Sequence, residues 1–278
     1  MAVSDDSHKD ISPFKPLFTP KNLPAALRDF LRDYEEQAPS KPMRLVKYIS
    51  QRVSLSRRTV DALIQRGHAT VDGSVVTNPA THVGVGNVVI FRGNQLPVAE
   101  ETPMLFGYHK PKGLLTSHGD PFGRPCVWDH LPDWLPAGLV SVGRLDQDTE
   151  GLLLLTNSGA LKRFMELPKN ALQRRYRVWC KGAPLSKDHV LQATKGLQDG
   201  DINYRPFRLD LKPDSKICGE GMQSFRHKVC DLTLTEGKKR EVRRIMTLWG
   251  NHVTRLVRLS YGPFLLSGIK NGDARRFV

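Results

Sequence analysis

The sequence lacks the patterns that mark membrane-spanning or exported proteins. No apolar run reaches the length of about 18 residues that a transmembrane helix needs. No short apolar segment near the N-terminus resembles a secretion signal, and the acidic start argues against an arginine-rich transit peptide. These absences predict a cytoplasmic protein that does not bind membranes.

Cysteine is also scarce, and its spacing excludes the common metal-binding patterns. The four cysteines include no Cys-x-x-Cys pair. His227 and Cys230, with Cys218 upstream, come nearest to a zinc ligand set, but a fourth ligand is missing. Scattered thiols of this kind are typical of reduced, cytosolic proteins. We therefore expect no metal and no cofactor.

The sequence has a large excess of positive charge. The chain of 278 residues carries a formal net charge of +14, with a pI of about 9.8. Residues 1–40 contain five Lys or Arg against seven Asp or Glu, so the remainder carries +16. A polyanionic partner is required, and nucleic acid fits better than a membrane because no basic amphipathic anchor is present.

Composition and periodicity divide the chain into four parts. Residues 1–20 are polar and interrupted by proline, which predicts disorder. Leu27, Phe30 and Leu31 lie at helical spacing and predict a short helix ending near residue 38. The predicted parts are a tail with this helix at 1–42, a compact unit at 43–92, a linker at 93–103 and a larger unit at 104–278.

The unit at 43–92 has the pattern of two helices followed by a small sheet. Apolar residues at helical spacing predict one helix around residues 45–53 and a second around 60–64, which Ser54 or Ser56 can cap. Asp72-Gly73 stands between two short apolar runs and predicts a tight turn. A further strand is expected around residues 88–91.

This unit resembles the S4 RNA-binding domain. The resemblance rests on residues 44–49 (RLVKYI), 56–58 (SRR), 63–67 (LIQRG) and 71–73 (VDG). Seven basic residues stand against two acidic ones in this unit. Charged helix faces are usually only solvated, but such an imbalance on one small unit favours RNA binding. The expected RNA contacts here are Arg44, Lys47, Arg57, Arg58 and Arg66.

The larger unit is rich in strands and contains short helices. Because strands and helices do not alternate regularly, we expect an α+β fold with a mixed, largely antiparallel sheet. Strands are expected at residues 104–108, 139–142, 152–156, 176–181, 207–211, 229–235 and 254–259. Helices are expected at residues 159–166, 186–194 and 240–249.

The most informative segment is residues 143–151 (GRLDQDTEG), which lead into an apolar strand. It places Asp146 in a turn bracketed by glycines, where a flat ligand can approach the backbone closely. An aspartate in a turn often only stabilises that turn. Asp148 and Glu150 also suggest a glycosidase carboxylate pair, although a strongly basic chain is a poor match to carbohydrate hydrolysis.

As a whole, this segment resembles the catalytic signature of RNA pseudouridine synthases, in particular the rRNA-modifying RsuA/RluB family. Three further segments match that family in the expected order: residues 108–113 (YHKPKG), 174–178 (RRYRV) and 236–245 (EGKKREVRRI). Glu241 stands where many members carry glutamine. Four motifs in order, with an S4-type unit in front, are far more specific than any one motif.

The resemblance implies the isomerisation of uridine to pseudouridine, a reaction without metal or redox cofactor. It implies that Asp146 is the catalytic nucleophile, and it leaves open whether this carboxylate attacks the base, attacks the sugar or removes a sugar proton. It places Arg243 beside Asp146, where a guanidinium favours the charged carboxylate. It also implies that Tyr176 stacks on the uracil and helps to remove the proton at C5, although a tyrosine in a strand is more often core.

The remaining basic residues of the motifs are candidates for RNA contacts. A uridine inside folded RNA must be flipped out before any chemistry, and Arg144 can fill the vacated space. Arg243 and Arg244 begin a helix rich in charge, so a purely structural role is the alternative for them. The expected contacts in this unit are Lys110, Lys112, Arg144, Arg174, Arg175, Lys238, Arg240 and Arg244.

The expected partner is ribosomal RNA or an immature ribosomal subunit, bound by a monomer. Residues 120–125 (DPFGRP) and 241–245 (EVRRI) favour large-subunit over small-subunit rRNA. The alternative is a non-catalytic rRNA-binding assembly factor that keeps the fold. Asp146, Tyr176 and Arg243 argue against it, because binding alone does not require this trio.

Overall fold

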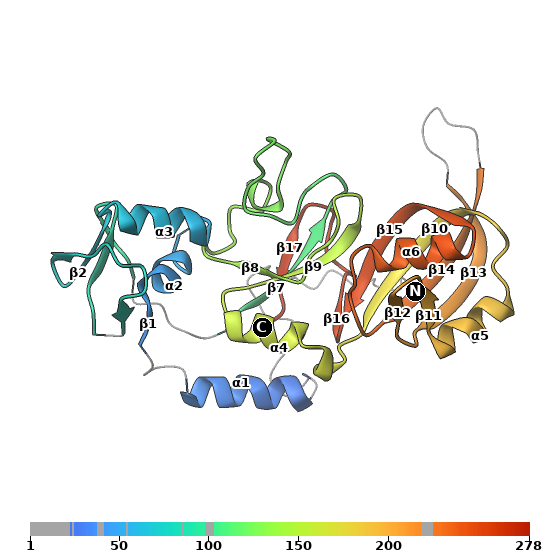
Figure 1. Ribbon diagram of the computed structural model, residues 1–278, viewed down its shortest axis with the longest axis horizontal. Coiled ribbons are helices and arrows are strands. Elements are labelled where there is room, and N and C mark those ends of the chain that lie inside the picture. The colour runs from blue at the N-terminus through green and yellow to red at the C-terminus, as the bar shows by residue number, and fades with distance from the viewer. Residues whose placement is uncertain are drawn as a thin grey trace, which may run out of the picture.

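Two folded units follow one another in the computed structural model, and a helix near the N-terminus packs on the second unit (Figure 1). The structure describes residues 23, 25–37, 42–53, 55–84, 86–97, 103–217 and 225–278. The tail predicted to be disordered at 1–20 and the proposed zinc ligand Cys218 lie outside these residues. None of the helices that the structure describes is long and apolar enough to cross a membrane.

The first unit combines two helices with small sheets. Helices α2 (Leu45–Ser50) and α3 (Arg57–Gln65) pack together over a core that includes Leu45, Ile49 and Ile64. Ser56 caps α3 by accepting a hydrogen bond from the backbone N–H of Thr59. The strands pair in the order β3 (Ser74–Val75), β2 (Ala69–Val71), β5 (Val89–Phe91) and β6 (Asn94–Gln95), and β1 (Met43–Arg44) pairs with β4 (His82–Val83).

Strand β6 corrects the predicted linker at 93–103. Residues Arg92 and Gly93 adopt positive φ angles of 51° and 80° and form a tight turn that pairs β6 with β5. Leu96 then packs into the core of the first unit. The sequence did not indicate this strand because its two residues are polar and exposed. The first unit therefore extends to about residue 97.

The second unit is built on one mixed sheet. Its strand order is β13 (Arg208–Ile217), β14 (Phe225–Leu234), β10 (Arg174–Gly182), β15 (Asn251–Tyr261), β9 (Glu150–Thr156), β7 (Leu105–Lys110) and β17 (Ala274–Arg276). Strands β8 (Val140–Val142) and β16 (Phe264–Leu265) pair with β9 and β15. Only the β9–β15 pair is parallel among these pairings, so the predicted largely antiparallel α+β sheet is confirmed.

Short helices cover this sheet. They are α4 (Gly159–Glu166), α5 (Lys187–Lys195), α6 (Glu241–Leu248) and the 3₁₀ turns η3 (Val127–Asp129) and η4 (Pro168–Asn170). A hairpin of β11 (Leu197–Asp199) and β12 (Ile202–Tyr204) follows α5. Helix α4 begins and ends at the predicted residues, and Ser158 caps it by accepting the N–H of Leu161.

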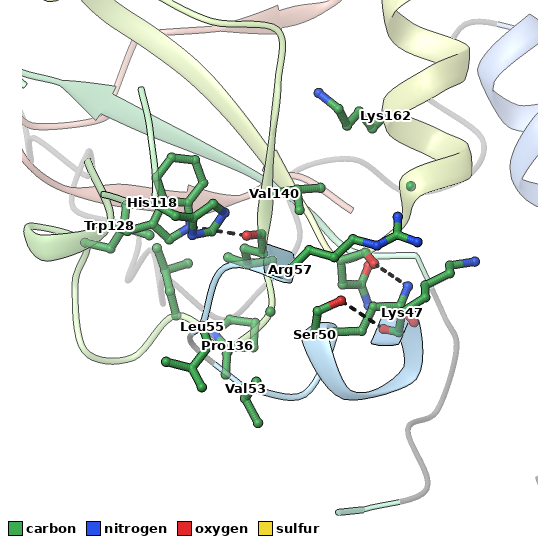
Figure 2. Close-up of a pocket in the computed structure, with 18 of the residues that line it drawn as sticks. Lys47, Ser50, Val53, Leu55, Arg57, His118, Trp128, Pro136, Val140 and Lys162 are labelled. Atoms are coloured by element: carbon green, nitrogen blue, oxygen red, sulfur yellow. Dashed lines mark hydrogen bonds between the residues drawn. The ribbon is translucent and has the colours of Figure 1, made fainter. Parts of the chain in front are cut away.

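The two units touch through backbone as well as side chains. Gly138 has a φ of +76°, and a Cβ there would lie 2.0 Å from the carbonyl oxygen of Gln51, so only glycine fits. The side-chain amide of Gln51 donates to the carbonyl of Asn157 at 3.3 Å. A cavity of about 570 Å³ lies at this junction, with Lys47 and Arg57 on one side and His118 and Trp128 on the other (Figure 2).

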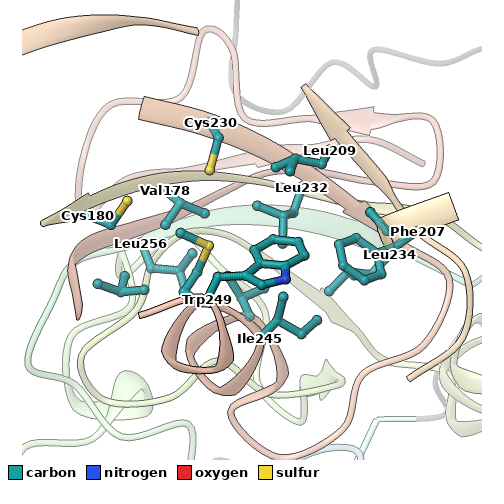
Figure 3. Packing of buried hydrophobic residues seen from close by; sticks show 14 of the residues in the cluster. Val178, Cys180, Phe207, Leu209, Cys230, Leu232, Leu234, Ile245, Trp249 and Leu256 are labelled. Atoms are coloured by element: carbon teal, nitrogen blue, oxygen red, sulfur yellow. The ribbon is translucent and has the colours of Figure 1, made fainter. Parts of the chain in front are cut away.

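The sheet of the second unit has separate cores on the two sides of the β9–β15 junction. On one side, Ile245 and Trp249 from the α6 segment pack against Val178, Leu232 and Leu256 of the sheet (Figure 3). On the other side, the core gathers around β7, β9 and α4. Each fully buried large apolar side chain of this kind contributes about 1.5–3 kcal/mol, so burial stabilises both flanks of the junction.

Helix α1 (Ala25–Gln37) confirms the helix predicted before residue 38 and adds a contact that the sequence did not show. Leu23, Leu27 and Leu31 are buried in the core beside α4, and the ring of Phe30 stacks on Phe164 with centroids 4.6 Å apart. Figure 1 shows α1 lying alongside α4. The predicted segment 1–42 thus contains a structural part of the second unit.

Candidate active site

A cavity of about 530 Å³ opens beside the junction of β9, β15 and β10. Asp146, Tyr176 and Arg243, which the motifs singled out, all line it. The strand register explains part of this meeting, because Tyr176 pairs with Arg258 across β10 and β15, and Arg258 pairs with Gly151 across β15 and β9. Residues from four distant segments are therefore brought to one place.

The parallel pairing of β9 with β15 depends on Gly151. Its φ is +104°, and a Cβ there would lie 2.4 Å from the carbonyl oxygen of Arg258. A side chain would force the two strands apart. The glycine at the end of the Asp146 motif therefore sets the distance between the turn and the opposite wall of the cavity.

Backbone and side-chain hydrogen bonds fix the turn that carries Asp146. The hydroxyl of Thr116 donates to the carbonyl of Leu145 at 2.8 Å and accepts the N–H of Leu145 at 3.2 Å. Gln147 bonds twice to Gly113, through its backbone carbonyl at 2.8 Å and its side-chain amide at 3.0 Å. The carboxylate is thus attached to a rigid backbone, as a preorganised catalytic group requires.

The carboxylate of Asp146 differs from its two acidic neighbours. It is half-buried, and none of the residues that the structure describes donates a hydrogen bond to it or forms an ion pair with it. Asp148 instead pairs with Arg240 and Arg243, each at 3.2 Å, and Glu150 pairs with Arg255 at 2.9 Å. Asp146 is left available to a ligand, whereas both carboxylates of the alternative glycosidase pair are held by arginines.

Arg243 enters the cavity wall from α6, on the same cavity as Asp146. Its guanidinium donates to the carbonyls of Asp148 at 2.9 Å and Val253 at 3.1 Å, and it pairs with the Asp148 carboxylate. It forms no ion pair with Asp146. Burial lowers the pKa of Arg243, and the negative charges of Asp148 and Asp146 oppose that shift. Arg243 can therefore affect Asp146 in two ways: through its positive charge, and by holding Asp148 in the turn that carries Asp146.

Arg258 is a residue of this cavity that the sequence analysis missed. Its side chain is 2% exposed, and its Nε donates to the carbonyl of Leu152 at 2.7 Å. One guanidinium nitrogen, Nη2, is buried and has no acceptor among the described residues. An unpaired buried donor is costly, which marks it as a group that a ligand can satisfy. The one available signal was a charge between two apolar residues, Val257 and Leu259.

The basic residues of β10 face different sides of the sheet. Arg174 and Tyr176 line the cavity, and Arg174 donates to the hydroxyl of Tyr261 at 2.6 Å. Arg175 points to the opposite face, because side chains alternate along a strand. There it shares the buried Asp231 with Arg177, at 2.5 and 2.8 Å. Arg175 is therefore not among the residues that line the cavity with Tyr176, and its contact with RNA stays a prediction.

The position of Lys110 contradicts its predicted role as an RNA contact. It was expected on the RNA surface, but its side chain is completely buried and donates to the carbonyls of Thr149 at 2.8 Å and Pro111 at 3.0 Å. Burial lowers its pKa to about 8, against the opposing charges of Asp148, Glu150 and Asp146. The end of β7 points inward here, so Lys110 supports the Asp146 turn from behind.

The other predicted RNA contacts are accessible. In the second unit, Arg144, Lys238 and Arg240 line the cavity, whereas Arg244 lines a shallower depression of about 300 Å³ next to it. Lys112 is exposed near the turn. In the first unit, all five predicted residues are exposed and none forms an ion pair within the described part of the chain: Arg44, Lys47, Arg57, Arg58 and Arg66.

Buried cysteines and acidic side chains do not assemble into a metal centre in the described part of the chain. Cys126, Cys180 and Cys230 are buried as free thiols, and burial strongly raises the pKa of Cys230. No group of three or more His, Cys, Asp or Glu side chains in these residues is arranged to hold a metal ion.

Comparison with known proteins defines the class. The family described as RNA pseudouridylate synthase matches residues 105–248, and the S4 domain matches residues 43–89. The fold is thus that of the RNA pseudouridine synthases, which are isomerases. The chain belongs to the RNA pseudouridine synthase family and carries an S4 domain, as the motifs predicted.

Individual relatives agree with this assignment. A protein of Rickettsia felis named "Uncharacterized RNA pseudouridine synthase" is 39% identical over 230 residues, which covers 82% of this chain and 94% of that protein. "Ribosomal large subunit pseudouridine synthase B" of Yersinia pestis is 34% identical and covers 82% and 70%. A solved structure titled "Crystal structure of pseudouridylate synthase" aligns with a TM-score of 0.55 and 26% identity, covering 85% of this chain and 96% of that one.

Proposed function

We propose that this protein isomerises a specific uridine of large-subunit ribosomal RNA to pseudouridine, with Asp146 as the catalytic nucleophile. One observation carries this proposal: the Asp146 carboxylate lies on a fixed turn, lines a cavity and has no protein donor among the described residues. A carboxylate in that state can attack an electrophilic carbon of the substrate.

The cavity suits a single extruded nucleoside. A volume of about 530 Å³ is too small for a base pair with its backbone, so the uridine enters after flipping out of the RNA. Tyr176 supplies an aromatic face in the cavity wall, and the exposed Arg144 lies at the rim, where it can occupy the vacated stack. The unpaired Nη2 of Arg258 can donate to a polar atom of the bound nucleotide.

The reaction needs little beyond these groups. The N1–C1′ bond breaks, the uracil turns, C5 bonds to C1′, the proton at C5 leaves and N1 takes up a proton. A nucleophilic carboxylate divides the exchange into two steps through a covalent intermediate, and Tyr176 is placed on the wall to assist the final proton removal. The buried Arg243 and Arg258 contribute positive potential while the carboxylate reacts.

Ribosomal RNA is proposed as the substrate on two grounds. Relatives named as ribosomal large-subunit pseudouridine synthases are 34% identical over most of the chain. The S4 domain also presents five exposed basic side chains without an ion pair in the described part of the chain. We propose residues 43–97 as the RNA-anchoring unit, residues 103–278 as the catalytic unit, and a monomer as the active form.

The direct test measures tritium release from rRNA transcripts labelled at uridine C5, with wild type and Asp146→Ala in parallel. We expect release by the wild type only, with both proteins binding the RNA equally. The transcripts represent the two subunits separately, so the same assay tests the large-subunit assignment. No release by the wild type from naked rRNA or immature particles, with binding retained, would support the non-catalytic assembly factor.

Removing positive charges from the S4 domain tests its contribution to RNA binding. Deleting residues 1–92 would also remove α1 from the catalytic core, so point substitutions are cleaner. Arg57→Gln with Arg58→Gln should weaken rRNA binding and reduce the slope of log affinity against log salt by about 0.7–0.9 for each lost phosphate contact. Arg28→Gln on the exposed face of α1 is the matched control. An unchanged slope would refute RNA anchoring by these residues.

A further inference from the structure

The loop at residues 117–125, called the finger below, exposes an aromatic ring at its tip. Phe122 is 81% exposed, the most exposed of the large apolar side chains that the structure describes. A single exposed apolar residue is common on protein surfaces, so the fixed shape of the tip and the groups around the ring must indicate what it binds. Neither the fold nor the proposed chemistry uses this ring.

The finger tip is held in one shape by Asp120. Its carboxylate accepts the backbone N–H groups of Phe122 at 3.0 Å and Arg124 at 3.1 Å. It also accepts two bonds from the Arg124 guanidinium, at 3.0 and 2.6 Å. These bonds lower the pKa of Asp120 to about 2. A fixed tip presents the ring at little cost in conformational entropy on binding.

The base of the finger is joined to the active-site turn. Leu115 and Cys126 form a bridge at its root, with bonds from Leu115 to Pro125 at 2.9 Å and from Val127 to Leu115 at 2.8 Å. Thr116, between the root and the finger, makes the two bonds to Leu145 that fix the Asp146 turn. His118 stacks on Trp128 with centroids 3.8 Å apart, on the wall of the cavity between the units (Figure 2).

The surroundings of Phe122 identify the kind of partner. The guanidinium of Arg124 lies 5.6 Å from the ring centroid, which combines a cation with an aromatic face at one tip. Stacking faces combined with a cation are how proteins hold unpaired nucleobases and their phosphates. A protein partner would require a wider apolar surface than a single ring.

We propose that Phe122 stacks on an unpaired nucleobase next to the target uridine and holds the RNA in the conformation that delivers the uridine to Asp146. This inference rests on the proposed function, because the RNA is the substrate. Asp120 is the positioning residue of the finger, and Arg124 pairs with the adjoining phosphate through the guanidinium surface that Asp120 leaves free. Specificity for the site then depends on a base outside the cavity.

The test compares Phe122→Ala, Phe122→Leu and Phe122→Tyr with the wild type. Because the ring is exposed, none of these should change the unfolding midpoint. Phe122→Ala and Phe122→Leu should raise Kd and KM for unmodified rRNA by about 5- to 150-fold, the range found when a base-stacking aromatic is truncated, and Phe122→Tyr should restore both. Leu191→Ala on α5, where the side chain is 61% exposed, is the control for loss of an exposed apolar group.

The outcomes separate the finger from the proposed function. Equal Kd and KM for Phe122→Ala and the wild type would overturn the inference while leaving the isomerase intact. Restoration by leucine as well as tyrosine would also overturn it, because apolar contact rather than stacking would then suffice. If the wild type releases no tritium, the proposed function fails, and the Kd comparison on the same rRNA still decides whether the ring stacks on RNA.

Discussion

The guanidinium of Arg243 pairs with Asp148 at 3.2 Å, two residues beyond Asp146 in the same turn. It also donates to the Asp148 carbonyl at 2.9 Å, so one arginine holds both the backbone and the side chain of that residue. The carboxylate expected to react is thereby kept free, while its neighbour neutralises the buried cation. The arrangement makes Asp148 a support of the site.

Asp148→Asn should therefore destabilise the fold by about 1–3 kcal/mol, because it leaves the buried Arg243 without its counter-charge. Chemical denaturation measures this loss. Glu150→Gln is the matched control, since its partner Arg255 is 47% exposed and such pairs contribute at most about 1 kcal/mol. Equal losses in the two variants would contradict the support role of Asp148.

Asp146→Asn should remove activity without loss of stability. No described residue depends on the Asp146 carboxylate for a hydrogen bond, so its replacement leaves no protein group unsatisfied. We expect the free energy of unfolding to stay within about 0.5 kcal/mol of the wild type, and tritium release to fall to background. A large loss of stability would show that the carboxylate has a structural partner, and retained release would exclude it as the nucleophile.

Lys110 should make stability depend on pH in the alkaline range. Its pKa is lowered from 10.5 to about 8 by burial, so between these values the unfolded chain binds the extra proton. Stability therefore rises with pH across this window, relative to a variant without the group. The free energy of unfolding of wild type minus that of Lys110→Met should increase by up to about 3 kcal/mol from pH 8 to 10.5. If the difference in unfolding free energy between the two proteins does not change with pH, the pKa of Lys110 is not lowered by burial.

Glu241 should make stability depend on pH in the opposite direction, and at lower pH than Lys110. Burial raises its pKa from 4.5 to about 7, so between these values the folded chain holds the proton that the unfolded chain has lost. Stability therefore falls as the pH rises through this window. Glu241→Gln removes the titration and can still accept the N–H of Lys238, which the carboxylate accepts at 2.8 Å.

We expect Glu241→Gln to match the wild type near pH 4.5 and to exceed its free energy of unfolding by about 2–3 kcal/mol above pH 7. Denaturant melts at a series of pH values measure this difference. A constant offset between the two proteins at all pH values would instead indicate a change of packing.

Helix α1 should stabilise the catalytic unit. Leu27 is 3% exposed in the core beside α4, so Leu27→Ala should cost about 2–5 kcal/mol of unfolding free energy. Arg28→Ala, on the exposed side of the same helix, controls for helix propensity and should cost less than about 0.5 kcal/mol. If the two substitutions have equal effects in denaturation, α1 is not docked in solution.

Local patterns predicted much of this molecule. Helix α4 matches its predicted bounds, Ser56 proved to be one of the two suggested caps, and Asp72-Gly73 forms the expected turn. These features depend on neighbours within a few residues, which a sequence displays directly. The motif around Asp146 was informative for the same reason, because a short turn needs its glycines at fixed positions.

Side-chain direction was harder to predict where it depends on distant strands. Lys110 and Arg175 carry the same charge as the exposed Lys112 and Arg144, so composition could not separate them. The pairing of β10 with β14 brings Arg175 to Asp231, and its pairing with β15 places Tyr176 opposite Arg258 in the wall of the cavity. A shift of one residue in that register would exchange the two faces.

Motifs and composition were enough to predict the family, two folded units and the carboxylate that we propose as the nucleophile. They could not predict that Asp148 is paired while Asp146 is not, that Arg258 lines the cavity, or that α1 packs into the core beside α4. The difference lies in how far apart the interacting residues are along the chain. A turn or cap is fixed by adjacent residues, whereas the contacts of Arg243 and Arg258 join segments about 100 residues apart that meet when β9 and β15 pair. The docking of α1 beside α4 likewise joins segments far apart in the chain.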